Sequence, residues 1–219
     1  MIQMTDWDIV QNLLLAARWT IALSIVAFAG GMLLGIILLP VRIAHNKGVR
    51  IIGRLYVELF QGSPLLIQLF VIFFGLPLIG IRPSAWTAAA VGMTLWSAAF
   101  FAEIWRGSVE SVLRGQWEAS AALGMSYAQQ MRHVILPQAM PVSIAPTVGF
   151  MVQIIKGTAV TSIIGFVELS RAGGIITNAT FLPFKVYGIV ALIYFGLCWP
   201  LSKASRVLER KLNGAHLHH

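Results

Sequence analysis

The feature that most constrains this chain is an apolar run without a charged side chain, from Thr20 to Val41, "TIALSIVAFAGGMLLGIILLPV". A helix needs about 20 such residues to cross the hydrocarbon core of a bilayer. A transmembrane β-strand would instead alternate polar and apolar residues, and this run does not. The sequence therefore predicts that the chain spans a membrane as α-helices.

Composition extends this prediction to the whole chain. Of the 219 residues, 58% are hydrophobic and only 11% are charged, whereas about a quarter of a soluble domain is charged. We predict an all-α fold, a polytopic membrane bundle of five transmembrane helices that forms a single domain over residues 1–219. The predicted spans are residues 19–41, 55–81, 84–104, 142–164 and 186–205.

The basic residues predict the orientation of this bundle. The net charge is +8, and lysines and arginines gather in three places, around residues 42–54, around 106–132 and from 203 onward. The positive-inside rule places such segments in the cytoplasm. The N-terminus is then expected outside and the C-terminus inside. This distribution favours membrane lipid as the partner of the positive charge, and not nucleic acid.

The predicted cytoplasmic loop between spans three and four, residues 106–137, is polar but favours helix. "QWEASAAL" contains good helix formers, and Gly124 is typical of a helix C-terminal stop. Ser126 and Gln129 fit a capping box, and Pro137 fits the first turn of the following helix. The pattern predicts a helix–turn–helix. It suits docking into another protein's groove, and an amphipathic connector on the bilayer is an equal alternative.

The spacing in this loop resembles the EAA loop of ABC-importer permease subunits, which reads E-A-A, three residues, G, nine residues and I-x-L-P. The stretch from Glu118 to Pro137 is "EASAALGMSYAQQMRHVILP", with Ser120 in place of Ala and Val134 in place of Ile. Two further stretches, "QGSPLLIQLF" and "AEIWRGSVESVLRGQWEASAALGMS", are similar to those of polar amino-acid permeases of the histidine, glutamine and arginine type.

The resemblance implies that the chain is the permease subunit of an ATP-driven importer in the plasma (inner) membrane. A cytoplasmic ATPase dimer would bind ATP and Mg, an extracytoplasmic amino-acid-binding protein would deliver the solute, and a second permease subunit, identical or homologous, would complete the path. No catalytic residue, cofactor or metal is then expected in this chain, which has no P-loop pattern. The expected ATPase-coupling residues are Glu118, Ala119, Ser120, Ala122, Leu123, Gly124 and Pro137.

A lysine inside the predicted fourth span, Lys156, indicates the solute path. Lysine at this depth costs about 2.5–3.5 kcal/mol on insertion scales and usually faces a bundle interior or a wet cavity. The alternative is a structural lysine that snorkels outward. Gly157 stands where many resembling permeases have an acid, which slightly disfavours a basic solute. The path candidates are Lys156, Gln153, Thr158, Thr161, Glu58 and Gln61.

Other patterns predict local features of the bundle. Pro141 and Pro146 should kink or unwind span four. The G-x-x-x-G pattern at residues 31–35 can allow close helix packing, and Glu103 and Arg106, three apart on a helix, can form an ion pair. A metal role is not expected for the histidine-rich end "AHLHH".

The sequence leaves several functions open. The EAA loop is shared by permeases for other solutes, such as opines, metals or oxyanions. A secondary transporter or a channel is a less favoured alternative, because such proteins often contain internal repeats and this chain shows none. The identity of the solute, and whether the second permease is the same chain, are not decided by the sequence.

Overall fold

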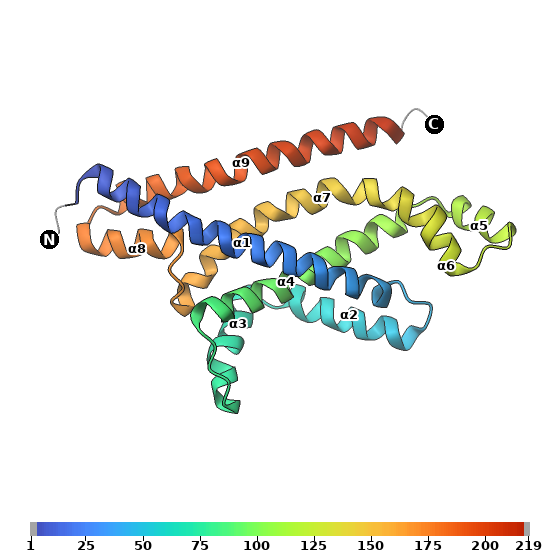
Figure 1. Ribbon diagram of the computed structural model, residues 1–219, viewed down its shortest axis with the longest axis horizontal. Coiled ribbons are helices and arrows are strands. Elements are labelled where there is room, and N and C mark those ends of the chain that lie inside the picture. Colours follow the sequence, from blue (N-terminus) through green and yellow to red (C-terminus); the bar gives the residue numbers. More distant parts are fainter. Residues whose placement is uncertain (1–3, 217–219) are drawn as a thin grey trace.

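A bundle of long helices forms the computed structural model of the protein, which describes residues 4–216. The histidine-rich end lies outside the described residues from position 217 onward. The long helices are α1 (Asp6–Arg42), α4 (Ala85–Glu110), α7 (Leu136–Gly157) and α9 (Pro183–His216). They run side by side, with α1 crossing α4 and α7 (Figure 1). The predicted all-α membrane bundle is confirmed.

Shorter helices lie at the side and at the two ends of the bundle (Figure 1). α2 (Lys47–Gly62) packs along α4, and α3 (Leu65–Phe70) leaves it at a sharp bend. α8 (Leu169–Thr180) lies at the end where α1 begins. α5 (Arg114–Ala122) and α6 (Tyr127–Gln130) lie together at the opposite end. The bundle therefore carries a different helical attachment at each end.

The first spanning helix, α1, is longer than the predicted span of residues 19–41. It begins at Asp6, because the backbone N–H of Thr5 donates to the Asp8 carboxylate (2.9 Å) and the backbone N–H of Asp8 donates to the Thr5 hydroxyl (3.2 Å). This reciprocal capping box starts a helix in polar sequence, which hydropathy does not detect. At 1.5 Å per residue α1 is about 55 Å long, so it extends beyond a hydrocarbon core of about 30 Å.

The predicted second span, residues 55–81, is wrong as a single helix. The chain bends by 102° between α2 and the helical stretch that follows. Ser63 is extended there, with φ −109° and ψ 145°, because Pro64 disfavours helical geometry in the residue before it. Beyond α3 the chain forms a π turn (η1, Val71–Gly75) and a 3-10 turn (η2, Leu76–Ile79).

The fourth spanning helix also differs from its prediction. It is helical from Tyr127 to Ile164, and α7 continues as an α-helix through Pro141 and Pro146. Of the kink or unwinding expected at these prolines, the unwinding does not occur. The departure from α geometry is instead a π turn, η3 (Met131–Ile135), just ahead of the first proline of α7. An extra residue in that turn makes room for the ring that collides with the preceding turn of a regular helix.

The predicted loop of residues 106–137 is shorter in the structure, because the helices on both sides extend into it. α4 continues to Glu110, and α6 starts the fourth spanning helix at Tyr127. The ends of these helices are polar, so a hydropathy pattern places them inside the loop. Only α5 and its flanking turns lie between the two spanning helices.

Close packing of α1 on α4 confirms the prediction from the G-x-x-x-G pattern. A Cβ atom added to Gly31 would lie 2.6 Å from the Cβ of Ser97, and one added to Gly35 would lie 2.9 Å from the Cβ of Phe101. Real side chains do not approach so closely, so both positions require glycine unless the helices separate. α1 and α4 therefore form one tightly packed unit, as small residues allow in membrane helices.

Candidate functional site

The turn between α5 and α6 has a defined helix-ending geometry. Gly124 has φ +75°, a left-handed conformation that glycine adopts without steric cost. The backbone N–H of Met125 donates to the carbonyl of Ser120 (3.2 Å), and that of Gly124 donates to the carbonyl of Ala121 (2.9 Å). These two bonds make a Schellman motif. The predicted stop at Gly124 is confirmed.

The start of α6 is fixed by its own side chains. The backbone N–H of Ser126 donates to Oε1 of Gln129 at 2.8 Å, which is the glutamine half of the predicted capping box. Beneath the turn a small hydrophobic cluster joins α4, η3 and α7, and Trp117 of α5 packs against it. Its buried members are Val109, Met131, Ile135 and Ala139. The helix–turn–helix is therefore packed against the ends of α4 and α7.

The outer face of α5 is open. The carboxylate of Glu118 accepts a hydrogen bond from Nε of Arg114 at 2.9 Å on the surface, and Leu123 is 82% exposed. Ser120 is buried and donates to the carbonyl of Gln116 (2.8 Å), so it faces the bundle. Exposed are Glu118, Ala119, Ala122, Leu123 and Gly124, together with Pro137 in the first turn of α7. This face therefore presents the apolar side chain of Leu123 among small residues and the Glu118 carboxylate.

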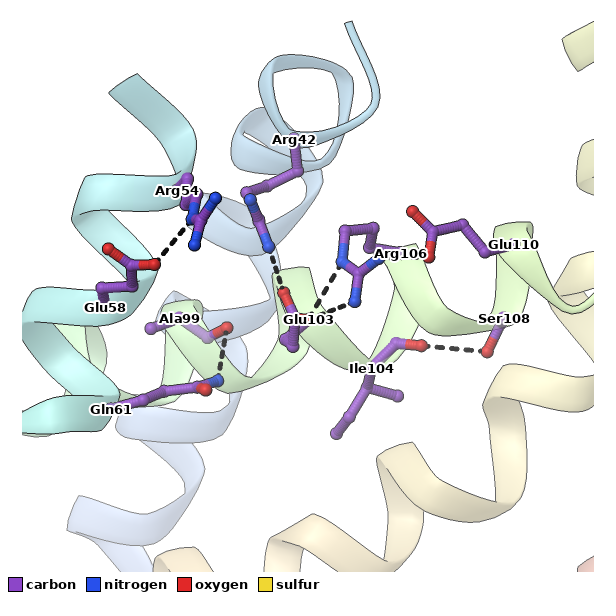
Figure 2. A network of polar contacts seen from close by, with 10 residues as sticks. All are labelled: Arg42, Arg54, Glu58, Gln61, Ala99, Glu103, Ile104, Arg106, Ser108 and Glu110. Atoms are coloured by element: carbon purple, nitrogen blue, oxygen red, sulfur yellow. Dashed lines mark hydrogen bonds and ion pairs between the residues drawn. The ribbon is translucent and has the colours of Figure 1, made fainter. Parts of the chain in front are cut away.

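An ion-pair network ties the end of α1 to α4 (Figure 2). Nη2 of Arg42 contacts Oε2 of Glu103 at 2.6 Å, and the Arg42 side chain is only 10% exposed. Nε of Arg106 donates to Oε1 of Glu103 at 2.9 Å, which confirms the predicted pair, and Arg106 also pairs with Glu110. The sequence did not reveal Arg42 as a member. Because this pair is partly buried, removing one partner would leave a poorly solvated charge.

Beside this network lies an open cavity of about 500 Å³, and most of its lining residues are charged or polar. Glu58 pairs with Nε of Arg54 at 2.6 Å, and Nε2 of Gln61 donates to the carbonyl of Ala99 at 3.3 Å (Figure 2). The lining residues are Arg42, Arg54, Val57, Glu58, Gln61, Gly62 and Glu103. Two path candidates thus share a cavity of mixed charge, and within the part of the chain that the structure describes no residue of α7 lines it.

The path candidates on α7 and after it fall into two groups. Gln153 and Lys156, three residues apart on one helix face, are exposed. Thr158 and Thr161 are fully buried in the 3-10 segment η4 (Thr158–Ile164). Their hydroxyls donate to the carbonyls of Ile155 (2.8 Å) and Thr158 (2.6 Å). In this conformation only the first pair presents polar groups at the surface of the chain.

Lys156 forms no ion pair with any acid of residues 4–216. Glu58, which could have been its partner, is paired within α2. At Gly157 an added Cβ would lie 3.4 Å from Cε of Met93, so a side chain there would point at α4 and away from the Lys156 surface. The charge of Lys156 is therefore available to a group outside this chain.

A buried acid that sequence reasoning missed is Glu168, at the N-terminus of α8. It is fully buried and accepts hydrogen bonds from the backbone N–H groups of Ser170 (2.9 Å) and Arg171 (2.9 Å), the Tyr194 hydroxyl (2.8 Å) and the Thr20 hydroxyl (3.4 Å). Burial raises the pKa of its carboxyl, and these hydrogen bonds oppose that shift. It joins α1, α8 and α9. An acid within the apolar stretch "IIGFVELS" was the signal that could have revealed it.

Together these features define a class of protein. Among the described residues, four helices are long and apolar enough to cross a membrane, or five if the bent pair of α2 and the stretch after it is one span. A charged cavity and an exposed lysine lie along this bundle, and a packed helix–turn–helix with an open face lies at one end. This is the architecture of a multi-pass membrane transport subunit.

The chain belongs to the family of binding-protein-dependent transport system inner membrane components, which it matches over residues 10–213. It is 34% identical to the "Probable amino-acid ABC transporter permease protein YckA" of Bacillus subtilis, over 96% of this chain and 98% of that protein. It is also 34% identical to the "Probable glutamine ABC transporter permease protein GlnM" of Bacillus subtilis, over 90% and 91%.

A solved structure shares this fold closely. A crystal structure of an amino acid ABC transporter with histidines superposes with a TM-score of 0.88 and 31% sequence identity, over 96% of this chain and 100% of that one. The chain is thus a multi-pass component of the inner membrane and part of an ABC transport system.

Proposed function

We propose that this chain forms the translocation path of an ATP-driven importer for a polar amino acid, delivered by an extracytoplasmic binding protein. The observation that carries the proposal is the helix–turn–helix of α5 and α6, with its Schellman turn at Gly124 and its exposed small-residue face. The relatives named for amino acids and for glutamine support the solute class.

The proposed partners follow from the two ends of the bundle. A cytoplasmic ATPase dimer, which binds ATP and Mg, receives the open face of α5 in a groove, where Leu123 would be buried. A second permease subunit, identical or homologous, packs beside this one. In this arrangement the N-terminus and α8 lie outside, and α5, α6 and the C-terminus lie in the cytoplasm. Lys156 pairs with the carboxylate that every amino acid carries.

Transport by the assembled system tests this proposal. The chain is co-reconstituted in liposomes with its ATPase subunit and binding protein, and uptake of labelled amino acids is measured with and without ATP. We expect ATP-dependent uptake of a neutral polar amino acid that requires both partners. Uptake driven by an ion gradient alone would identify a secondary transporter. ATP-dependent uptake of only an opine, a metal or an oxyanion would overturn the solute class.

Replacing Lys156 with alanine should lower amino-acid uptake while complex yield stays normal. The lysine has no ion-pair partner among residues 4–216, so its removal orphans no described acid. Losing one charge-assisted hydrogen bond to a carboxylate corresponds to a rise in KM of about tenfold or more. The measurement is uptake kinetics in reconstituted liposomes.

Lys156→Arg is the matched control, because it keeps the positive charge, and it should retain most of the uptake. Normal uptake by Lys156→Ala would contradict a role in the path and identify a lysine that only snorkels outward. A low yield of the assembled complex would instead show that the lysine is needed for folding.

Labelling of single cysteines tests the proposed orientation. The only native cysteine, Cys198, is buried and is first replaced by serine. A cysteine at Ile175, half-exposed on α8, should react with a membrane-impermeant maleimide in intact cells. Cysteines at Lys47 and Met125 should react only after permeabilisation. Labelling in the reverse order would overturn the proposed orientation of the bundle.

A further inference from the structure

Tyr127, the first residue of α6, touches the end of α1, which lies 84 positions earlier in the chain. Its hydroxyl donates to the carbonyl of Ile43, the C-terminal cap of α1, at 3.2 Å. Its ring lies 5.1 Å from the ring of His45 and 6.2 Å from the ring of Trp117 in α5, centroid to centroid. Three aromatic rings from three segments of the chain thus meet at the end of α1.

Arg42, the residue next to this contact, is held in place by an ion pair. Arg42 precedes Ile43, is 10% exposed and pairs with Glu103 of α4 at 2.6 Å (Figure 2). Ile43 also packs against the hydrophobic cluster under the α5–α6 turn. The end of α1 is therefore held both by the helix–turn–helix and by α4, and a displacement of Tyr127 acts on a helix end that has little freedom to absorb it.

The other half of α1 reaches the opposite end of the bundle. Its Thr20 hydroxyl donates to Glu168 and accepts from the backbone N–H of Leu169 at 3.1 Å. Ile9 and Leu13 are buried in a cluster with residues of α8 and α9. A long helix that is packed at both ends moves as a rigid element, because packed interiors transmit displacement with little compression.

We propose that Tyr127 is a positioning residue that transmits movement of the α5–α6 unit to α1. Closure of the ATPase then acts on α1 through this contact, as well as on α4 and α7 through the covalent chain, and the displacement reaches α8 through the Thr20–Glu168 contact. The inference rests on the proposed function, because it requires an ATPase seated on α5. We expect the ring of Tyr127 to contribute more to this mechanical contact than its hydroxyl does. The ring packs against two other rings, whereas the hydroxyl has one acceptor.

The test compares Tyr127→Ala with Tyr127→Phe in the complete reconstituted complex, with His133→Ala as a control on an exposed side chain of η3. The readouts are complex yield, ATP hydrolysis and solute moved per ATP. Removing two aromatic contacts should lower the amount of solute moved per ATP by about fivefold or more. We expect this loss for alanine, with yield and hydrolysis near wild type, and we expect phenylalanine to restore most of the ratio.

A probe on α1 gives a second readout that does not depend on the solute. A spin label on Ile37, 65% exposed, in the Cys198→Ser background, should report an ATP-dependent displacement of α1 that Tyr127→Ala reduces, while packing of α1 against α4 preserves the remainder. An unchanged transport ratio and label displacement in Tyr127→Ala would overturn the inference. The inference would also be overturned if yield and ATP hydrolysis fell in proportion to uptake, because the contact would then be merely structural. A wild-type chain that binds no ATPase would instead overturn the proposed function.

Discussion

Replacing Glu168 with alanine is expected to destabilise the subunit severely and to lower the yield of folded protein. The change removes the acceptor of four donors, including the buried hydroxyl of Tyr194. Hydrogen bonds to a charged group are worth about 1.5–3 kcal/mol each, so a loss of about 3 kcal/mol or more is expected. That is a large fraction of a typical folding stability of about 5–15 kcal/mol. The measurement is yield and thermal midpoint of the purified complex in detergent.

Two further variants separate the effect of losing the Glu168 carboxylate from a general loss of stability. Glu168→Gln keeps one acceptor oxygen and a similar volume, and its neutral amide costs less to bury, so it should be less harmful than alanine. Glu118→Ala removes an exposed acid whose surface pair with Arg114 contributes little to stability, so its midpoint should match wild type. A wild-type midpoint for Glu168→Ala would show that the carboxylate does not hold α8.

Replacing Gly124 with valine is expected to uncouple ATP hydrolysis from uptake. The left-handed turn at φ +75° costs an L-residue about 1–2 kcal/mol, and a β-branched side chain resists it further. Nothing lies within 4 Å of a Cβ added there, so backbone strain is the only direct penalty. A distorted turn would misplace the face of α5, and uptake should fall to about a tenth or less. Uptake and ATP hydrolysis are measured together in liposomes.

Gly115→Val is the matched control for this prediction. Gly115 lies in α5, and a Cβ added to it also meets nothing within 4 Å, but its φ is outside the left-handed region. It should therefore keep most of the uptake. Equal loss in both variants would show that bulk on α5 matters and the turn does not, and wild-type uptake for Gly124→Val would contradict a role for this turn in coupling.

The turn at Gly124 and the α1–α4 packing could be predicted from the sequence because their causes are local. A Schellman turn requires a left-handed residue directly after the helix, and Gly124 stands there. The cap between Ser126 and Gln129 spans three residues. The glycines at 31 and 35 indicate close approach through their own missing side chains, although the sequence does not name the partner helix.

The paths of the second and fourth spanning segments were predicted less well. A hydropathy pattern measures apolar length and not direction, so the bend at Pro64 was missed and the polar ends of α4 and of the fourth helix were assigned to a loop. Of the kink or unwinding expected at Pro141 and Pro146, unwinding does not occur, because helical packing tolerates the loss of one backbone N–H per proline in a membrane.

The helical membrane character of this chain and its glycine turn at residue 124 follow from the sequence alone, because apolar length, capping and glycine geometry act within a few residues. Which distant side chains meet depends on the tertiary structure. The Arg42–Glu103 pair joins residues 61 positions apart, and the Thr20–Glu168 contact joins residues 148 apart. Such contacts depend on how whole helices pack, and in a bilayer packing is set by shape and hydrogen bonding between helices, which no local pattern encodes.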